Sequence, residues 1–431
     1  MAVFYIALSI IRPYDELFPE LGTIHFERIY AICMIAAVFL GRGNKLRIKM
    51  SFQTVAVVLL LLAIGVSTLF AWKTSFALNP FYVYLTLVIF YFVLIVVARS
   101  PYELVFVVAC YILAMATCLA KCQWEYFVHD RHLSSMGVRR MIGITDLHGG
   151  PNGLAMSIVV SLPMWWFLYS VRDRFTRGWP NLWRKWFSRS LVIYFALALT
   201  SIMLTNSRSG MLSFVLFVLL MALRGQGGMR KLKRVMAGVM ILLAIWSVLP
   251  QEQKNRFRTI WDPTAGPPSA TSSAYGRIEG FKAGITMFKR FPLTGVGVGN
   301  FIPYRRAHVD GVGLDPHNMV GQVLGETGVV GSMIFVLVVA SIFANCRKVR
   351  VLASGRSNPT LDVLSGLAVA CRDAVILLAF EGLFGHNVRR FNWLWLAAFG
   401  YLALEYTKQH IRQTISQSKA SEKKREALHQ C

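Results

Sequence analysis

Long apolar runs separated by polar segments constrain the fold of this 431-residue chain more than any other feature of its sequence. A helix needs about 20 apolar residues to cross a bilayer core of about 30 Å. The runs that approach this length, of which the first two are short, are roughly 1–11, 29–40, 51–71, 80–98, 102–120, 153–171, 190–206, 210–223, 235–249, 328–344, 361–384 and 391–407. With 55% hydrophobic residues, the chain is predicted to be an all-α polytopic membrane protein with about twelve transmembrane helices.

The positions of lysine and arginine predict how these helices are oriented. Basic clusters such as 42–49, 224–234 and 347–356 recur in alternate short segments, and cytoplasmic loops of membrane proteins are enriched in these residues. Both termini are therefore expected in the cytoplasm, and the longest polar segment is expected on the outer face. The predicted divisions are transmembrane helices 1 to 9 in 1–249, an outer loop with short helices in 250–316, transmembrane helices 10 to 12 in 317–407 and a cytoplasmic tail in 408–431.

Two further polar segments are expected at the membrane interface. Residues 121–150 mix aromatic, acidic and histidine side chains and are long enough to lie over the bundle as an interfacial helix. Residues 172–189 interleave tryptophan with arginine and lysine, which is typical of an amphipathic helix lying in the headgroup layer.

The chain is strongly basic, with 46 Lys and Arg against 21 Asp and Glu. These residues lie between apolar runs, where they set topology and meet anionic lipid, so membrane lipid is the expected partner and nucleic acid is not. The seven cysteines form no CxxC pair, which indicates neither a zinc site nor a disulfide framework. No metal and no other cofactor is expected.

The turn Ser207-Arg208-Ser209-Gly210 joins two apolar runs on the outer face, and Gly210 is expected to interrupt the helix that follows. One interpretation is that Arg208 reaches the lipid headgroups. The other is that Arg208 binds a phosphate, because a guanidinium pairs with two phosphate oxygens at once. Spacing alone does not decide between them.

Within the outer loop, Thr271 to Gly276 is interpreted as a small-residue linker, and Arg277 opens a helical pattern that ends near residue 291. Arg277 is therefore expected near a helix N-terminus, where free N–H groups and the dipole favour an anion. The glycines within 295–299 lack the Lys-Ser/Thr of a nucleotide-binding loop. They are interpreted as a turn that lets backbones approach closely.

The sequence Asp315-Pro316-His317-Asn318 predicts the start of a helix, with Asp315 as the N-cap and Pro316 as the first helical residue. His317 would then lie in the first turn, where the neutral imidazole is favoured. It could serve as a structural hydrogen-bonding group, a metal ligand or a base. No second ligand stands at metal spacing on the same helix.

Charged residues in and near the last apolar runs are further candidates. Arg372 and Asp373 interrupt one run, and intramembrane charges are candidates for function, although a structural ion contact explains them equally well. His386, Arg389 and Arg390 lie in the last short outer turn. There they are candidates for donor contacts or for a positive rim around an outer cavity.

Three groups of residues together resemble the O-antigen ligase and polymerase superfamily. They are Ser207-Arg208-Ser209-Gly210, then Gly276-Arg277 with the glycine-rich stretch 291–301, then His317-Asn318 with Gly325-Glu326-Thr327-Gly328. The resemblance implies a multi-pass glycosyltransferase of the bacterial inner membrane with a periplasmic active site. It also implies that Arg208 and Arg277 bind the diphosphate of a lipid-linked glycan donor and that His317 is the catalytic base.

From this resemblance we expect an O-antigen ligase that transfers an undecaprenyl-diphosphate-linked glycan to lipid A-core oligosaccharide by a metal-independent, inverting reaction. An O-antigen polymerase or a protein O-glycosylation ligase of the same superfamily is the nearest alternative, because these relatives differ in the acceptor surface. A transporter of a lipid-linked anion is a more distant alternative. Aromatic residues of the outer loop are candidates for stacking against sugars: Trp261, Tyr275, Phe301 and Tyr304.

Overall fold

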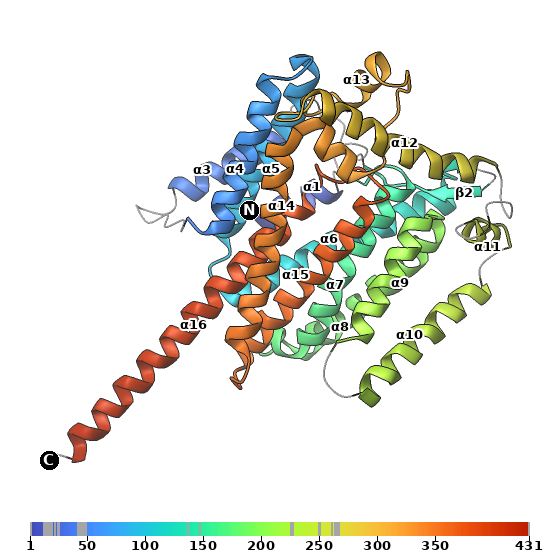
Figure 1. Ribbon diagram of the computed structural model, residues 1–431. Coiled ribbons are helices and arrows are strands. Elements are labelled where there is room, and N and C mark those ends of the chain that lie inside the picture. The colour runs from blue at the N-terminus through green and yellow to red at the C-terminus, as the bar shows by residue number, and fades with distance from the viewer. Residues whose placement is uncertain are drawn as a thin grey trace.

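The computed structural model describes residues 2–11, 20, 23, 26–40, 50–135, 138–145, 148–224, 228–248, 251–259, 262 and 268–429 (Figure 1). In the first half of the chain the elements are α1 (Ala2–Ile11), α3 (Phe26–Leu40), α4 (Phe52–Leu69), α5 (Thr74–Val97), α6 (Pro101–Val128), β1 (His132–Ser135), β2 (Val138–Met141), α7 (Pro151–Phe175), α8 (Asn181–Thr205) and α9 (Arg208–Ala222). The second half contains α10 (Gly228–Val248), α11 (Gln251–Arg258), α12 (Pro268–Arg290), α13 (Phe301–His308), α14 (Met319–Ala353), α15 (Pro359–Gly382) and α16 (Asn392–His429).

Local capping signals determine where several of these helices begin. The Ser100 hydroxyl accepts a hydrogen bond from the backbone N–H of Glu103 at 3.1 Å and so caps α6. The Asn358 side chain caps α15 in the same way by accepting from the backbone N–H of Thr360 at 2.9 Å. In both helices proline follows the cap, where its fixed φ suits the first helical position and its missing N–H costs nothing.

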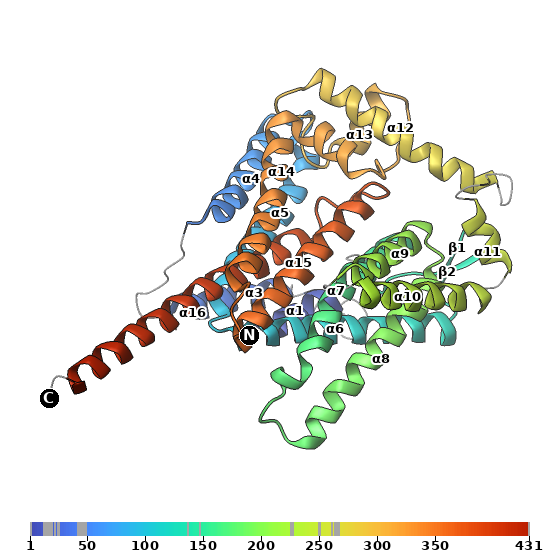
Figure 2. The same cartoon turned by 60° about the horizontal axis from the view of Figure 1, so that its bottom comes forward.

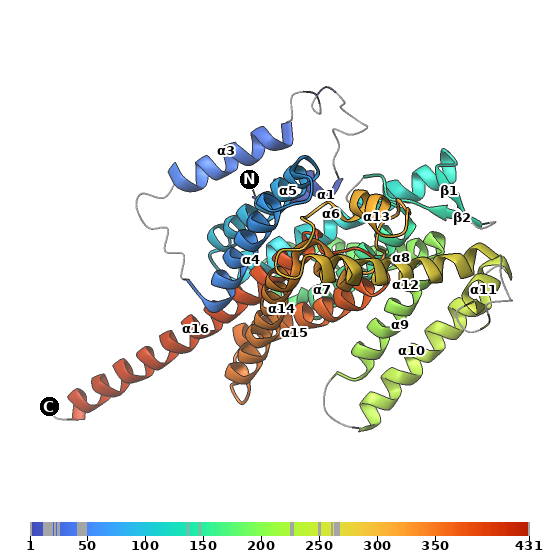
Figure 3. The same ribbon diagram turned by 45° about the horizontal axis from the view of Figure 1, so that its top comes forward.

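The core of the bundle is built around α7. In its most apolar window 83% of the residues are buried, against 28% for α8, so α7 is central and α8 is peripheral. Helix α15 packs against α7, α14 and α16. Helices α12 and α13 lie across one end of this bundle (Figures 1 and 3), and the C-terminal part of α16 extends away from it on the opposite side (Figures 1 and 2).

The apolar helices establish an α-helical polytopic membrane protein. Among the described residues, seven helices are long and apolar enough to cross a membrane, and α9 is a shorter apolar helix. The seven are α4, α5, α6, α7, α8, α14 and α15. The predicted number of twelve spans is not confirmed, because α1, α3 and α9 have only 10, 15 and 15 residues and α10 and α16 are not among the seven.

The helix expected over residues 121–150 is wrong after Val128, where α6 ends. The chain then forms an antiparallel hairpin, with His132 opposite Met141 and Ser135 opposite Val138. Arg140 of β2 attaches this hairpin to the bundle, since its Nε donates to the carbonyl oxygen of Thr205 at 3.0 Å. Arg140 is therefore buried and bonded to backbone, whereas an interfacial helix would have placed it at the membrane surface.

The separate amphipathic helix expected over residues 172–189 is also wrong. Helix α7 continues to Phe175, a turn follows, and α8 begins at Asn181 and continues through the next apolar run. Trp183 and Trp186 on the first turns of α8 are 62% and 53% exposed. These side chains therefore belong to the end of a long helix, where tryptophan typically meets the headgroup layer.

Candidate functional site

Arg208 is the first residue of α9, directly after the end of α8. Asn206 ends α8 in the left-handed region with φ 49°, and the Ser207 hydroxyl caps α9 by accepting from the backbone N–H of Gly210 at 3.2 Å. The tight turn expected here is present. Gly210 does not interrupt the helix. Instead it lets α9 approach α7, because a Cβ at this position would lie 2.5 Å from the Cβ of Ala155.

The side chain of Arg208 donates from Nη1 to the hydroxyl of Thr259 at 2.8 Å, just beyond α11. Its helix presents the positive end of the dipole at the same place, and free N–H groups in a first turn bind anions. Arg208 and the start of α9 therefore form one positive surface.

Arg277 lies in the interior of α12, which contradicts the expected linker before it. Helix α12 begins at Pro268 and includes the whole stretch from Thr271 to Gly276. Arg277 is therefore not near a helix N-terminus, and the dipole argument made for it does not apply. Its Nε donates to the carbonyl oxygen of Phe384, just past the end of α15, at 3.2 Å.

Burial lowers the pKa of Arg277, and the neighbouring positive charge of Arg208 lowers it further. This effect indicates that two guanidinium groups from distant segments lie near each other. Glu381 opposes both effects by stabilising the charged form of Arg277. Two arginines close enough to repel each other form a site that an anion would stabilise.

His317 precedes α14 instead of lying in its first turn. Asn318 is the N-cap, and its side chain accepts from the backbone N–H of Gly321 at 3.0 Å. The expected Asp315 cap is therefore wrong. His317 itself adopts the left-handed region with φ 45°, a conformation that is uncommon for residues other than glycine.

The pKa of His317 is lowered, mainly by burial, while Asp315 opposes the shift and Arg277 and Arg305 add to it. The neutral imidazole is thus favoured, as expected. The physical cause is burial and neighbouring arginines, not a helix dipole. Through Arg277, His317 belongs to the same cluster as Arg208.

His386 lies beside His317, with 5.6 Å between the ring centroids. Its Nε2 is 3.8 Å from an Asp315 carboxylate oxygen, and burial lowers its pKa while Asp315 opposes the shift. Arg389 and Arg390 also act on the pKa of His386. His386 therefore lies beside the predicted base, and Arg389 and Arg390 lie close to His386.

Arg390 is directed into the bundle and not toward an outer rim. Its Nη1 donates to the hydroxyl of Ser157 in α7 at 3.1 Å, and burial lowers its pKa to about 10. The same Ser157 hydroxyl oxygen lies 3.0 Å from His148 Nδ1. Arg390 thus links the site to the central helix of the fold.

Glycines hold α12 against the start of α14. A Cβ at Gly280 would lie 2.1 Å from the carbonyl oxygen of Pro316, and one at Gly284 would lie 2.2 Å from that of Gly321. Glycines thus permit close contact between α12 and this part of α14. Gly328 differs, because its φ of 63° and ψ of −161° place a kink inside α14.

The glycine-rich turn after α12 fills that kink. The backbone N–H of Val296 donates to the carbonyl oxygen of Gly325 at 2.9 Å, and that of Gly299 donates to a Glu326 carboxylate oxygen at 3.0 Å. The expected close approach of backbones is confirmed. Glu326 is occupied by this turn and so does not face His317.

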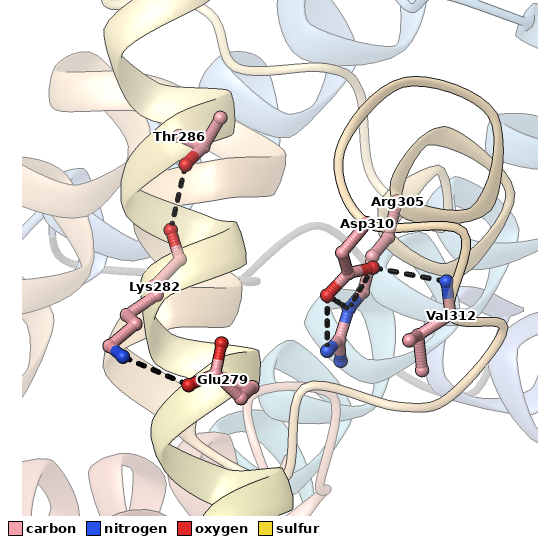
Figure 4. Close-up of polar contacts among 6 residues, drawn as sticks. All are labelled: Glu279, Lys282, Thr286, Arg305, Asp310 and Val312. Atoms are coloured by element: carbon pink, nitrogen blue, oxygen red, sulfur yellow. Dashed lines mark hydrogen bonds and ion pairs between the residues drawn. The ribbon is translucent and has the colours of Figure 1, made fainter.

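A second polar cluster supports the loop between α13 and His317 (Figure 4). Arg305 donates from Nη2 to Asp310 at 2.7 Å, and the backbone N–H of Val312 donates to the same carboxylate at 3.0 Å. On the facing surface of α12, Lys282 donates to Glu279 at 2.9 Å. Arg305 is buried and acts on His317, a role that nothing in its sequence context indicated.

Arg372 and Asp373 do not join the site. Asp373 is fully buried and accepts from Arg372 Nε at 2.8 Å and from Arg224 Nε at 3.0 Å. Arg224 follows the far end of α9, a helix of 15 residues that spans about 22 Å. Of the two interpretations offered for these charges, a structural ion contact inside the bundle is the one that fits Arg372, Asp373 and Arg224.

The aromatic candidates divide by exposure. Phe301 and Tyr304 are buried, at 2% and 4% exposure, in a small core with Met287, so they pack the loop and cannot stack on a ligand without its rearrangement. Tyr275 is 63% exposed and stays a candidate. Trp261 lies outside the described residues.

Glu381 is the main feature that the sequence interpretation missed. It is 3% exposed in the last turn of α15 and interacts with Arg277 and Arg390. The rule that intramembrane charges are candidates for function singled out Arg372 and Asp373 and applies equally to Glu381. Within the described parts of the chain, no group of three or more His, Cys, Asp and Glu side chains is arranged to hold a metal ion.

Residues 193–336 match the model of the family described as O-antigen ligase. The matched segment contains Arg208, Arg277 and His317, and it supports assignment of the chain to that family. A search of curated proteins found no match. Family members are ligases or polymerases of the glycosyltransferase type that act on lipid-linked glycans, which supports an enzyme of this broad class.

Proposed function

We propose that this chain, a member of the O-antigen ligase family, transfers an undecaprenyl-diphosphate-linked glycan to lipid A-core oligosaccharide at the periplasmic face of the inner membrane. The proposal is supported by charge effects that link Arg208 to Arg277 and Arg277 to His317, which come from distant segments. Arg208 lowers the pKa of Arg277, and Arg277 lowers that of His317. The proposed phosphate-binding groups and the proposed base thus all lie in the segment that matches the family.

Donor binding follows from the chemistry of the two arginines. Each guanidinium can pair with two oxygens of a diphosphate, and the start of α9 adds N–H groups and dipole field next to Arg208. The undecaprenyl chain would stay in the bilayer beside the apolar helices. Its diphosphate would then replace the mutual repulsion of Arg208 and Arg277 by attraction to both.

The transfer step is a single displacement at the anomeric carbon of the donor sugar. The oxygen of an acceptor hydroxyl attacks that carbon and forms the new glycosidic bond, while the bond from the carbon to the diphosphate oxygen breaks. The bonding electrons leave with undecaprenyl diphosphate, and the hydroxyl proton passes to His317. Attack opposite to the leaving group inverts the anomeric centre.

His317 suits the base role because its neutral form is favoured by burial and by nearby arginines. General-base action of this kind contributes about 10²- to 10⁴-fold to rate. Arginines that stabilise the charge developing on the leaving diphosphate contribute through electrostatic preorganisation. A diphosphate paired in this way needs neither a carboxylic general acid nor a metal, so transfer in the presence of EDTA is expected.

The test uses purified protein in detergent with undecaprenyl-diphosphate-linked glycan, with or without lipid A-core oligosaccharide. Glycan attached to lipid A-core, and no product without that acceptor, is the expected result. Extension of the glycan from donor alone would identify a polymerase, and transfer to a protein acceptor would identify a protein ligase. Absence of any new glycosidic bond, with movement of donor across proteoliposomes, would identify a transporter.

A further inference from the structure

Glu381 is a buried carboxylate surrounded by the positive groups of the site. It is 3% exposed and lies in the last turn of α15. The guanidinium groups of Arg277 and Arg390 act on it, and Ser209 and Ser213 face it from α9. It therefore stands between the start of α9 and the end of α15, the two helix ends that border the arginine cluster.

The hydrogen bonding of this carboxylate is incomplete. Its Oε1 and the hydroxyl oxygen of Ser213 are both buried, and neither makes a hydrogen bond of normal geometry within the described part of the chain, although Ser209 and Ser213 lie close enough to stabilise the ionised carboxylate. Buried polar atoms in native proteins are almost always paired, and an exception calls for an explanation such as strain, a catalytic role or a bound water or ion. Glu381 thus does not look like a residue retained only for packing.

The same helix end also holds Arg277 through the backbone. The N–H of Phe384 donates to the carbonyl oxygen of Glu381 at 3.0 Å, and Arg277 Nε donates to the carbonyl oxygen of Phe384 at 3.2 Å. This part of α15 therefore meets Arg277 with a backbone acceptor and with a carboxylate. When it is ionised, the carboxylate adds a negative charge that the backbone acceptor lacks.

We propose that Glu381 sets the affinity of the site for diphosphate, an inference that rests on the proposed function. In the donor-free enzyme the ionised carboxylate offsets the repulsion between Arg208 and Arg277 and the positive charge of Arg390. When diphosphate occupies the arginines, the carboxylate repels it in a low-dielectric environment and so limits how tightly the product is held. Glu381 is then a positioning residue that favours release of undecaprenyl diphosphate.

Glu381→Gln keeps the size of the side chain and removes its charge. The measurement is the Kd of the purified protein for undecaprenyl diphosphate in detergent, together with kcat for glycan transfer. We expect the Kd to fall by about tenfold and kcat to fall because product leaves more slowly. Tighter binding with slower turnover is a combination that simple loss of structure does not produce. Glu381→Met, which is uncharged and makes no strong hydrogen bond, should tighten binding in the same direction.

Glu326→Gln is the matched control. Glu326 is also buried, at 4% exposure, but its oxygens accept from Gly299 N–H and from Gln322 Nε2, and its Coulomb partner is Arg389. Its replacement should leave the Kd for undecaprenyl diphosphate unchanged.

Unchanged or weaker binding in Glu381→Gln would overturn the inference. So would failure of both Glu381 variants to purify as folded protein while Glu326→Gln purifies, because Glu381 would then be a structural requirement. Arg277→Ala separates this inference from the function it rests on. If Arg277→Ala binds undecaprenyl diphosphate as the wild type does, the proposed donor site itself is wrong. If it loses binding while Glu381→Gln changes nothing, only the role of Glu381 is wrong.

Discussion

Replacing Gly284 by alanine tests whether the contact between α12 and α14 positions Arg277. A Cβ at residue 284 would lie 2.2 Å from the carbonyl oxygen of Gly321 and 2.6 Å from its carbonyl carbon, whereas ordinary contact begins near 3.4 Å. Both clashing atoms belong to helix backbone, so no side-chain rotation relieves the contact. Helix α12 must therefore move from α14 by about 1 Å, and overpacking of this kind costs about 1 to 3 kcal/mol of folding free energy.

The displacement would also affect the site, because Arg277 lies about two turns before Gly284 on α12. A misplacement of about 1 Å in positioned groups can lower the rate about 10²-fold. We therefore expect Gly284→Ala to lower both the melting temperature and the kcat/KM for glycan transfer. Thermal unfolding in detergent and transfer to lipid A-core measure the two effects on one preparation.

Gly276→Ala is the control on the same helix. A Cβ at Gly276 would meet nothing within 4 Å, and alanine is favoured over glycine inside helices by about 1 kcal/mol, so the melting temperature should be equal or higher. A Gly284→Ala protein with the melting temperature and kcat/KM of the wild type would show that α12 does not depend on this contact. The argument that the contact between α12 and α14 positions Arg277 would then be refuted.

Three further predictions concern the chemistry. His317→Ala should lower kcat about 10²- to 10⁴-fold and leave the Kd for undecaprenyl diphosphate nearly unchanged, and full activity would refute the base role. Arg208→Lys and Arg277→Lys should each weaken diphosphate binding about tenfold or more, because a lysine cannot supply the bidentate fork; wild-type Kd values in both would remove the phosphate-binding argument. A base acts when neutral and the pKa of His317 is lowered from 6.5, so kcat/KM should fall with decreasing pH only below pH 6.5. An acidic limb centred above that value would contradict the assignment.

Features that depend on short stretches of sequence could be predicted. The apolar runs marked most of the long helices, since burial in lipid needs a continuous apolar length. The glycine-rich stretch 291–301 was correctly interpreted as a turn, because closely spaced glycines permit backbone contacts that a Cβ excludes. The turn before Arg208 was also predicted correctly, because it is a short polar segment between two apolar runs.

Features that depend on tertiary packing could not be predicted. The Ser- and Ala-rich stretch before Arg277 has weak local preference, and it is helical as part of α12, whose later turns pack on α14. Asp315 and Asn318 are both good N-caps, and the contact of Pro316 with Gly280 belongs to a fold in which Asn318 takes this role. The approach of Glu381 to Arg277 depends on two helices that are about a hundred residues apart in the chain.

The site combines two helix ends of opposite polarity, and this explains why its two predicted phosphate ligands differ. Arg208 begins α9, where the dipole adds to its positive charge and favours an incoming anion. Arg277 is bound by a carbonyl just past the end of α15, where the dipole and Glu381 stabilise the guanidinium itself. The first arrangement strengthens attraction for diphosphate, and the second fixes an arginine in place while reducing the net positive field. An enzyme that must bind a diphosphate donor and then release a diphosphate product needs both effects, because a site built only from the first would hold its product too tightly.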